Sequence, residues 1–432
     1  MNPTPLRCAF LCALVATALL PACATLPGNE EKKDFFRMEQ GLLYRNDDPW
    51  TMQAQYVQDL GRSGGAFSIM VPALARIAES GGNTVAFDLA GWNTDCTALD
   101  PAAVETVRIV ADRTQGQRMG AIVNVLGGLS DAALRETAVV TAAKALRGIG
   151  KAVYLIDGTG AEALAATFKH HAPGRIVVAP AGGDLRLVQS ASGASVSDFV
   201  WGAIPELRQD NIHFLLPGFD GDYLALEEAM KTPEERAPWT PDNSVLSAEE
   251  QAEGFIALFN GKNLDGWRYY GENKNGFRVT EAGEIEWVEE GGDGLLSHDR
   301  YSDFVLRLEF KIAQDGNSGI YLRAPRTARQ SKIGMEFQIR GDYGMPPGDN
   351  QTGAIYVQVA PKVNAGRPAG EWNAVEIALQ GSHMKAVLNG QVVQDINLDE
   401  NEELRYRLRR GFIGLQDHDC QVSFRNIRLK PL

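Results

Sequence analysis

The chain has 432 residues, more than the usual single-domain size of about 100 to 200 residues, so we expect more than one domain. Apolar residues make up 44% of the sequence, which is enough for two hydrophobic cores. With 55 acidic and 42 basic residues the formal net charge is −13, and no basic run is present. This balance argues against nucleic acid as a partner.

Residues 1–22 are typical of a signal peptide. Their apolar run, Cys8 to Leu20, has the length of a signal h-region and is too short to span a membrane as a helix. The sequence LPAC at positions 20–23 is similar to a bacterial lipobox, in which the cysteine becomes the lipid-modified N-terminus. We therefore expect an exported lipoprotein of the bacterial cell envelope, in the periplasm or at the outer membrane, with Cys23 lipidated and residues 23–38 as a tether. An ordinary secretory signal, cut near the same place, is the alternative.

Residues 39–230 alternate between apolar β-rich runs and helical stretches such as PAAVETVRIVADR. The runs NTVAFDL, GAIVNVL, AVYLID, RIVVAP, DFVWGA and HFLLPG are continuously apolar, as buried parallel strands are. They predict an α/β domain, either a degenerate (β/α) barrel or an open doubly wound parallel sheet. We favour the barrel because no glycine-rich phosphate loop follows a strand. Three prolines among charged residues predict that 231–253 is a linker, across which neither helix nor strand continues.

Polar and aromatic residues stand at the carboxyl ends of the predicted parallel strands, where chemistry collects in such a domain. Two of them, Asp88 and Asp157, are candidates for the carboxyl pair that a glycosidase needs. Asp is also common in such loops because it caps helices. The sequence leaves open whether this domain is itself a glycosidase, binds sugar passively or packs against the sandwich. The full set is Asp88, Trp92, Asn124, Asp157, Trp201 and Asp220.

Period-two alternation dominates residues 254–432 and predicts an all-β sandwich. In GIYLRA the side chains of Tyr321 and Arg323 share one face of the strand. In GMEFQIR the side chains of Glu336 and Gln338 share one face, opposite buried apolar residues. Polar residues are therefore expected to gather on a single face of the sandwich, where a functional site should be sought.

Several stretches of this segment agree in order and spacing with one family: GFIALFNGKNLDGW, GDGLLSHDRYSDFVLRLEFKI, GNSGIYLRAP, QTGAIYVQVAP, RPAGEWNAVEI and GFIGLQDHDCQVSFRNIRLKPL. They resemble the 3-keto-disaccharide hydrolase domain family. The resemblance implies a concanavalin-like jelly-roll sandwich related to lectins and glucanases. Two positions depart from the family pattern and bear on the width of the pocket: Asp419 replaces a usual Gly, and Met335 replaces a larger or aromatic residue.

The resemblance also implies a reaction. The substrate would be a glycoside already oxidised to a ketone at C3, supplied by a sugar 3-dehydrogenase in the same pathway. The ketone acidifies the hydrogen on C2, so one general base can remove it and the C1–O bond then breaks by elimination. Addition of water completes net hydrolysis. Such a route needs one base and donors to the enolate oxygen, and no pair of carboxylates.

We expect Glu336 or His418 to act as base or acid, because a histidine can exchange a proton near neutral pH. Arg323, Tyr321 and Gln338 are the expected donors to the enolate and to sugar hydroxyls. Further candidates for substrate binding are Glu309, Asn317, Trp372, Asn373, Gln416 and Asp417. The alternative class is a non-catalytic carbohydrate-binding sandwich attached to the α/β domain.

No metal or other cofactor is required by this sequence. The histidines of the C-terminal segment, His298, His383 and His418, are scattered, and neither CxxC nor HxxxH occurs. The acidic loop from Glu290 to Asp293 is compatible with a structural calcium ion.

Overall fold

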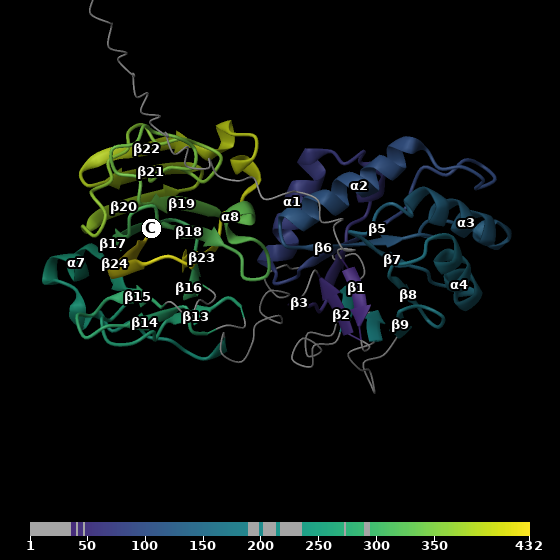
Figure 1. Ribbon diagram of the computed structural model, residues 1–432, viewed down its shortest axis with the longest axis horizontal. Coiled ribbons are helices and arrows are strands. Elements are labelled where there is room, and N and C mark those ends of the chain that lie inside the picture. Colours follow the sequence, from purple (N-terminus) through teal and green to yellow (C-terminus); the bar gives the residue numbers. More distant parts are fainter. Residues whose placement is uncertain are drawn as a thin grey trace, which may run out of the picture.

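The computed structural model describes residues 36–39, 42–45, 48–188, 198–201, 213–216, 236–271, 274–288 and 294–432. Figure 1 shows an α/β barrel beside a β-sandwich, with α1 and α2 of the barrel facing α8 of the sandwich. The predicted signal peptide, Cys23, Asp220 and the acidic loop from Glu290 to Asp293 lie outside the described residues, as does the side chain of Trp201.

Eight parallel strands close into a barrel in the order β10-β11-β4-β5-β6-β7-β8-β9, so the barrel is confirmed and the open sheet is not formed. Every neighbouring pair in this ring is parallel. The strands are β4 (Gln53–Tyr56), β5 (Thr84–Asp88), β6 (Gly120–Asn124), β7 (Val153–Leu155), β8 (Val177–Ala179), β9 (Leu185–Val188), β10 (Asp198–Trp201) and β11 (His213–Leu216).

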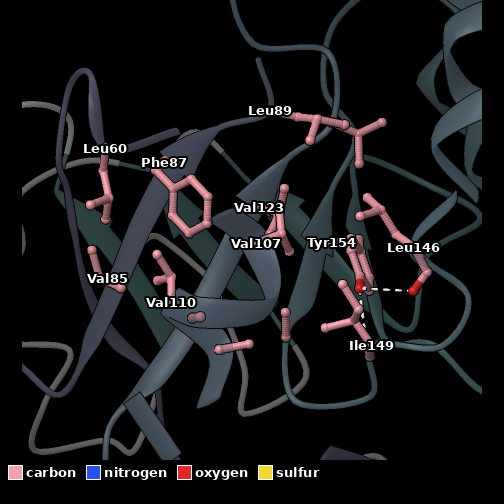
Figure 2. Close-up of a cluster of buried hydrophobic side chains, with 14 of the residues drawn as sticks. Leu60, Val85, Phe87, Leu89, Val107, Val110, Val123, Leu146, Ile149 and Tyr154 are labelled. Atoms are coloured by element: carbon pink, nitrogen blue, oxygen red, sulfur yellow. Dashed lines mark hydrogen bonds between the residues drawn. The ribbon is translucent and has the colours of Figure 1, made fainter. Parts of the chain in front are cut away.

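Helices cover the outside of this barrel. In β5, the large side chains Val85 and Phe87 pack outward against the helices (Figure 2). The small Ala86 between them belongs to the separate cluster inside the barrel. The predicted helix at 101–113 is confirmed and begins where the Asp100 side chain accepts a hydrogen bond from the amide of Ala102. The helices are α1 (Phe67–Glu79), α2 (Pro101–Gly116), α3 (Arg135–Leu146) and α4 (Ala161–His171), with 3-10 turns at Leu60–Arg62 and Ala132–Leu134.

A small antiparallel sheet precedes the barrel: β1 (Phe36–Glu39), β2 (Leu42–Arg45) and β3 (Asp48–Pro49). Phe36 and Leu43 are buried in the same apolar cluster as the side chains inside the barrel. The expected tether over 23–38 is therefore too long, because Phe36 begins a packed strand.

The expected linker contains short elements of its own. Its described part contains a 3-10 turn at Asn243–Val245 and a short helix, α7 (Ala248–Glu253). This helix begins with a capping box between Ser247 and Glu250. The capping sequence lies after the three prolines, so it can start a helix within the linker. The Asn243 side chain accepts a hydrogen bond from the amide of Ala257, so this part of the linker packs on the sandwich.

The C-terminal domain is a sandwich of two antiparallel sheets, as predicted. The larger sheet follows the order β14-β15-β24-β17-β20-β21-β22, with β12 beside β24. Its strands are β12 (Ile256–Ala257), β14 (Phe277–Val279), β15 (Ile285–Trp287), β17 (Phe304–Ile312), β20 (Asn373–Gln380), β21 (His383–Leu388), β22 (Gln391–Asn397) and β24 (Val422–Pro431).

The smaller sheet follows the order β13-β16-β23-β18-β19. Its strands are β13 (Trp267–Tyr269), β16 (Leu295–Tyr301), β18 (Asn317–Ala324), β19 (Met335–Arg340) and β23 (Gly411–Leu415). A short helix, α8 (Gln330–Ile333), leads into β19, and 3-10 turns lie at Leu398–Glu400 and Leu404–Tyr406. In β17 burial alternates strictly, but both faces of β18 and β19 are buried. The polar face of these two strands is thus not a solvated surface.

Cys96, which is buried, and Cys420, which is half-buried, are free thiols. In the part of the chain that the structure describes, no helix has the length and apolar character needed to cross a membrane.

Candidate active site

A pocket of about 130 Å³ lies over the polar face of β18 and β19. This volume is well below the roughly 300–1,000 Å³ of sites for drug-sized ligands, so it encloses little more than one sugar ring. Its walls come from β18, β19, α8, the loop after β23 and one residue of the barrel. The lining residues are Arg118, Tyr270, Asn317, Tyr321, Arg329, Gln330, Ser331, Glu336, Gln338, Tyr356, Gln416, Asp417 and His418.

Glu336 is the buried acid of this pocket, with 2% of its surface exposed. Burial raises its pKa to about 8, because a carboxylate loses the hydration that stabilises its charge. The charges of Arg329 and Lys332 and hydrogen bonds from Gln416 and Ser331 act in the opposite direction and keep the ionised form accessible. Glu336 is therefore poised to exchange a proton close to neutral pH.

Gln338 presents an unused acceptor to the same pocket. Its Nε2 donates to Oδ1 of Asn317 and to Oδ1 of Asn350, both at 3.0 Å, which orients the amide. Its Oε1 is buried and has no hydrogen-bond partner among the described residues. A buried acceptor without a partner is costly, so a sugar hydroxyl is a suitable donor here. This geometry corrects the expectation that Gln338 donates: both of its N–H groups are already used.

Tyr321 stands opposite Glu336 in the β18–β19 ladder. Burial raises the pKa of its phenol well above 10, so the group stays protonated and able to donate. Gln416 hydrogen-bonds to the side chains of both Tyr321 and Glu336, and the ring of Tyr270 meets that of Tyr321 edge-on at 6.2 Å. The phenol and the acid are thus held in one connected polar group.

The loop after β23 forms the rim of the pocket over Glu336. Oδ1 of Asp417 accepts a hydrogen bond from the indole nitrogen of Trp287 at 2.9 Å, whereas His418 is exposed at the mouth. Asp419 has a φ of 51°, a left-handed conformation that glycine adopts without cost. This backbone conformation explains why the family that the segment resembles usually has Gly at the position of Asp419.

Arg323 requires a correction. Its side chain is 0% exposed and is absent from the pocket lining. The guanidinium donates to the carbonyls of Ser302 at 2.6 Å and Gly381 at 3.0 Å and to Oδ1 of Asp303 at 3.0 Å. Because its nitrogens are used in these bonds, Arg323 ties loops of the sandwich together and does not donate to a substrate. Its φ of 49° breaks the alternation that the sequence pattern assumed.

Glu309, Trp372 and Asn373 do not line the pocket either. They belong to the larger sheet or its approach. Glu309 accepts a hydrogen bond from Nε of Arg425 at 2.6 Å, and the Arg425 guanidinium lies 3.9 Å from the centre of the Trp372 ring. Asn373 is buried and accepts hydrogen bonds from the amide of Arg367 and from Asn389. These contacts are structural, so the expected role of all three in substrate binding is not supported.

The barrel has its own hollow, of about 290 Å³, at the carboxyl ends of its strands. Asp88 and Trp92 line it, and Asp88 accepts a hydrogen bond from Asn124 at 3.0 Å. Asp157 is not in this lining; its carboxylate accepts a hydrogen bond from the amide of Gly158. The structure therefore does not assemble Asp88 and Asp157 as a carboxyl pair around this hollow.

A third hollow, of about 520 Å³, lies between the linker and the sandwich. Several of its polar side chains already have partners: Lys262 pairs with Asp242 at 3.0 Å, and both ring nitrogens of His298 are bonded, to Asp299 and to the carbonyl of Ala237. In the described ranges no cluster of three or more His, Cys, Asp or Glu side chains is arranged to hold a metal ion.

Sequence reasoning missed part of the pocket. Arg329 and Ser331 lie at the start of the short helix α8, in a polar stretch with no strand pattern, and Tyr270 follows strand β13, far away in sequence. The only local signal was the run of charged and polar residues in TARQSK. Arg118 belongs to the other domain, so no pattern within the sandwich could point to it.

The pocket thus combines a buried acid with amide, hydroxyl and guanidinium groups on one face of an antiparallel sandwich. Residues 254–430 match the model of the 3-keto-alpha-glucoside-1,2-lyase-like domain family, so the family resemblance is confirmed for this segment. The barrel lies outside the matched residues.

Known proteins that are similar to this chain include one sequence relative and two solved structures. A 3-keto-disaccharide hydrolase of Bacteroides thetaiotaomicron is 28% identical over 237 residues, covering 43% of this chain and 81% of that protein. A solved candidate glycosyl hydrolase of Parabacteroides distasonis is 25% identical, with 44% of this chain and 98% of its own covered and a TM-score of 0.40. The β-glucanase of Bacillus licheniformis is 14% identical, with 41% and 99% covered and a TM-score of 0.30.

Proposed function

We propose that this protein cleaves glycosides whose sugar carries a ketone at C3, and that the reaction takes place in the pocket over Glu336. The family match supports a hydrolase acting on glycosides. The finer proposal rests on the buried acid of this pocket: Glu336 has a pKa of about 8 and faces amide, hydroxyl and guanidinium groups. One strong base with donors is what proton abstraction next to a ketone requires.

In the proposed reaction the Glu336 carboxylate takes the proton from C2. The electron pair of the C–H bond forms an enolate with the C3 carbonyl, whose oxygen is stabilised by donors such as the phenol of Tyr321 and the guanidinium of Arg329. Collapse of the enolate expels the aglycone oxygen from C1 and leaves an enone. The aglycone oxygen takes up a proton, and water added at C1 completes the net hydrolysis.

The remaining polar groups would orient the sugar. Oε1 of Gln338 accepts a hydrogen bond from a hydroxyl, and the Asn317 and Asn350 side chains fix that acceptor. The backbone of Asn317 is itself fixed by Cys420. The cysteine sulfur accepts a hydrogen bond from the backbone N–H of Asn317 at 3.1 Å and donates one to its backbone carbonyl at 2.8 Å. His418 at the mouth is placed to exchange protons with solvent or with the leaving group.

The test is turnover of a 3-keto-glucoside and of its unoxidised parent, followed as release of the aglycone, with a Glu336→Gln variant beside the wild type. We expect cleavage of the keto form alone, and its loss in the variant. Tight binding of either sugar without cleavage would instead assign the sandwich to the non-catalytic binding class.

We further propose that the protein acts in the cell envelope, anchored through a lipid on Cys23, beside a sugar 3-dehydrogenase that supplies the ketone. The apolar run and the LPAC sequence support export and lipidation. Incorporation of labelled palmitate in cells, lost in a Cys23→Ser variant, is the expected result. Unlabelled wild-type protein would contradict the anchor.

A further inference from the structure

The barrel contributes a residue to the pocket of the sandwich. Arg118 belongs to the loop between α2 and β6, yet it lines the pocket together with Glu336. Its side chain is exposed at the mouth, and its φ is 56°. This left-handed conformation closes the C-terminus of α2, where the amide of Arg118 donates to the carbonyl of Gln115 and the amide of Met119 to that of Thr114.

A docking segment of the sandwich, residues 327–334, joins this loop to the pocket. The amide of Arg329 donates to the carbonyl of Gln117 at 2.8 Å, and the Thr327 hydroxyl donates to the carbonyl of Gly82 at 2.6 Å. Arg329 and Ser331, both in this segment, line the pocket and act on Glu336. The barrel backbone therefore holds part of the pocket wall.

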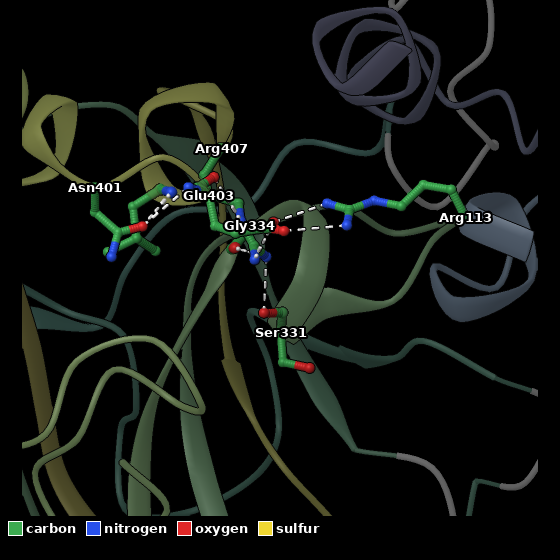
Figure 3. A network of polar contacts seen from close by, with 7 residues as sticks. Arg113, Ser331, Gly334, Asn401, Glu403 and Arg407 are labelled. Carbon is green, nitrogen blue, oxygen red and sulfur yellow. Dashed lines mark hydrogen bonds and ion pairs between the residues drawn. The ribbon is translucent and has the colours of Figure 1, made fainter. Parts of the chain in front are cut away.

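An ion-pair network anchors the same segment from the other side (Figure 3). Arg113 of α2 makes a two-pronged contact with Glu403, at 3.1 and 2.7 Å. Glu403 pairs with Arg407 at 3.5 Å, and the buried Arg407 donates to the carbonyls of Ser331 and Gly334. Through Glu403 and Arg407, Arg113 of the barrel is thus linked to the backbone at Ser331 and Gly334, just before Glu336.

Apolar packing makes the contact between the domains continuous. Ala328, Ile333 and Leu408 of the sandwich belong to the same buried cluster as the outer face of the barrel. Phe67 of α1 packs against Tyr406, with ring centres 5.8 Å apart. An interface with shared core residues and charged pairs holds two domains in a fixed arrangement better than a polar contact alone.

We propose that the pocket is a composite site, in which the barrel supplies Arg118 as a binding residue for the aglycone of the substrate. The inference rests on the proposed function. The sugar ring that reacts must lie against the buried Glu336, so the part of the substrate that reaches the exposed rim is the leaving group. A guanidinium offers five donors in a planar fork, which suits the clustered oxygens of a second sugar or a carboxylate.

The experiment compares two 3-keto substrates, a disaccharide and the methyl glycoside, with wild type and Arg118→Gly in the full chain. Glycine removes the guanidinium and accepts the φ of 56° without strain, so folding is preserved. Losing charged hydrogen bonds at the rim should raise KM for the disaccharide on the order of tenfold or more. KM for the methyl glycoside and kcat for both should stay unchanged, and Arg118→Lys should recover part of the loss.

The matched control is Arg108→Gly on α2, where the arginine pairs with Glu105 of the same helix. An unchanged KM for the disaccharide in Arg118→Gly, or equal increases for both substrates, would overturn the assignment. If wild type cleaves neither keto substrate, the proposed function fails. Calorimetric affinity for the keto disaccharide then tests the composite site: weaker binding in Arg118→Gly supports it, and equal affinity or no binding to wild type refutes it.

Discussion

Gly319 of β18 lies against the carboxyl group of Glu336, so closely that a β-carbon on Gly319 would stand 2.8 Å from Cγ of the acid and closer still to its Oε1. We expect Gly319→Ala to displace the carboxyl group and lower kcat/KM by about a hundredfold, since small misplacements of a reacting group cost that much. Gly116→Ala, where an added β-carbon meets nothing within 4 Å, is the control. Full activity in Gly319→Ala would show that Glu336 does not act from this position.

The pH dependence of turnover should report on Glu336. As a base the group must be ionised, and its pKa is raised to about 8, so kcat/KM should rise by about tenfold per pH unit below that value and level off above it. Steady-state kinetics from pH 6 to pH 9.5 measures this. A profile that falls across the same range would make Glu336 the acid of the reaction instead.

The same shift predicts a stability change. Between the ordinary pKa of 4.5 and about 8 the folded protein keeps the Glu336 proton that the unfolded chain has lost, so wild-type stability falls as pH rises through this window. A Glu336→Gln variant lacks this dependence. Relative to wild type it should gain roughly 1.4 kcal/mol per pH unit from pH 5 to 8 in denaturant unfolding. A difference that stays constant with pH would contradict the raised pKa.

We expect Arg323 to contribute to the stability of the folded protein and not to the rate of the reaction. Arg323→Met removes the fully buried partner of Asp303 and the donors to the carbonyls of Ser302 and Gly381, and we expect a loss of about 3 kcal/mol in the free energy of unfolding. Arg278→Met, which breaks an exposed pair with Glu286, should cost less than about 1 kcal/mol. Activity per folded molecule should survive both changes; a specific loss of kcat in Arg323→Met would restore its catalytic assignment.

A substitution at Asp88 tests whether the reaction takes place in the hollow of the barrel and not in the pocket over Glu336. Asp88→Asn keeps the shape of the side chain beside Asn124 and removes its charge. If the sandwich performs the reaction, turnover of the 3-keto substrate should match wild type, while Glu336→Gln is inactive. Loss of turnover in Asp88→Asn, with the fold intact by circular dichroism, would move the reaction to the barrel.

Local pattern predicted the elements well wherever one period ran without interruption. The apolar runs from NTVAFDL to HFLLPG appear as strands β5 to β8, β10 and β11, and the alternation in VLRLEFKI appears as β17 with every second residue buried. The period failed at Arg323, where a positive φ turns the side chain into a buried ion pair. It also failed at Phe36, whose burial depends on the distant interior of the barrel.

Strand periodicity and motif order are local properties of the chain, and they were enough to predict the two domain types, the family of the sandwich and the polar face that carries Glu336, Gln338, Tyr321 and the QDH rim. The burial of Glu336, the packing roles of Arg323, Glu309, Trp372 and Asn373, and the place of Arg118 in the pocket follow from the folded arrangement alone. Burial and charge pairing depend on which surfaces meet, and residues 118 and 336 meet across more than 200 residues of chain.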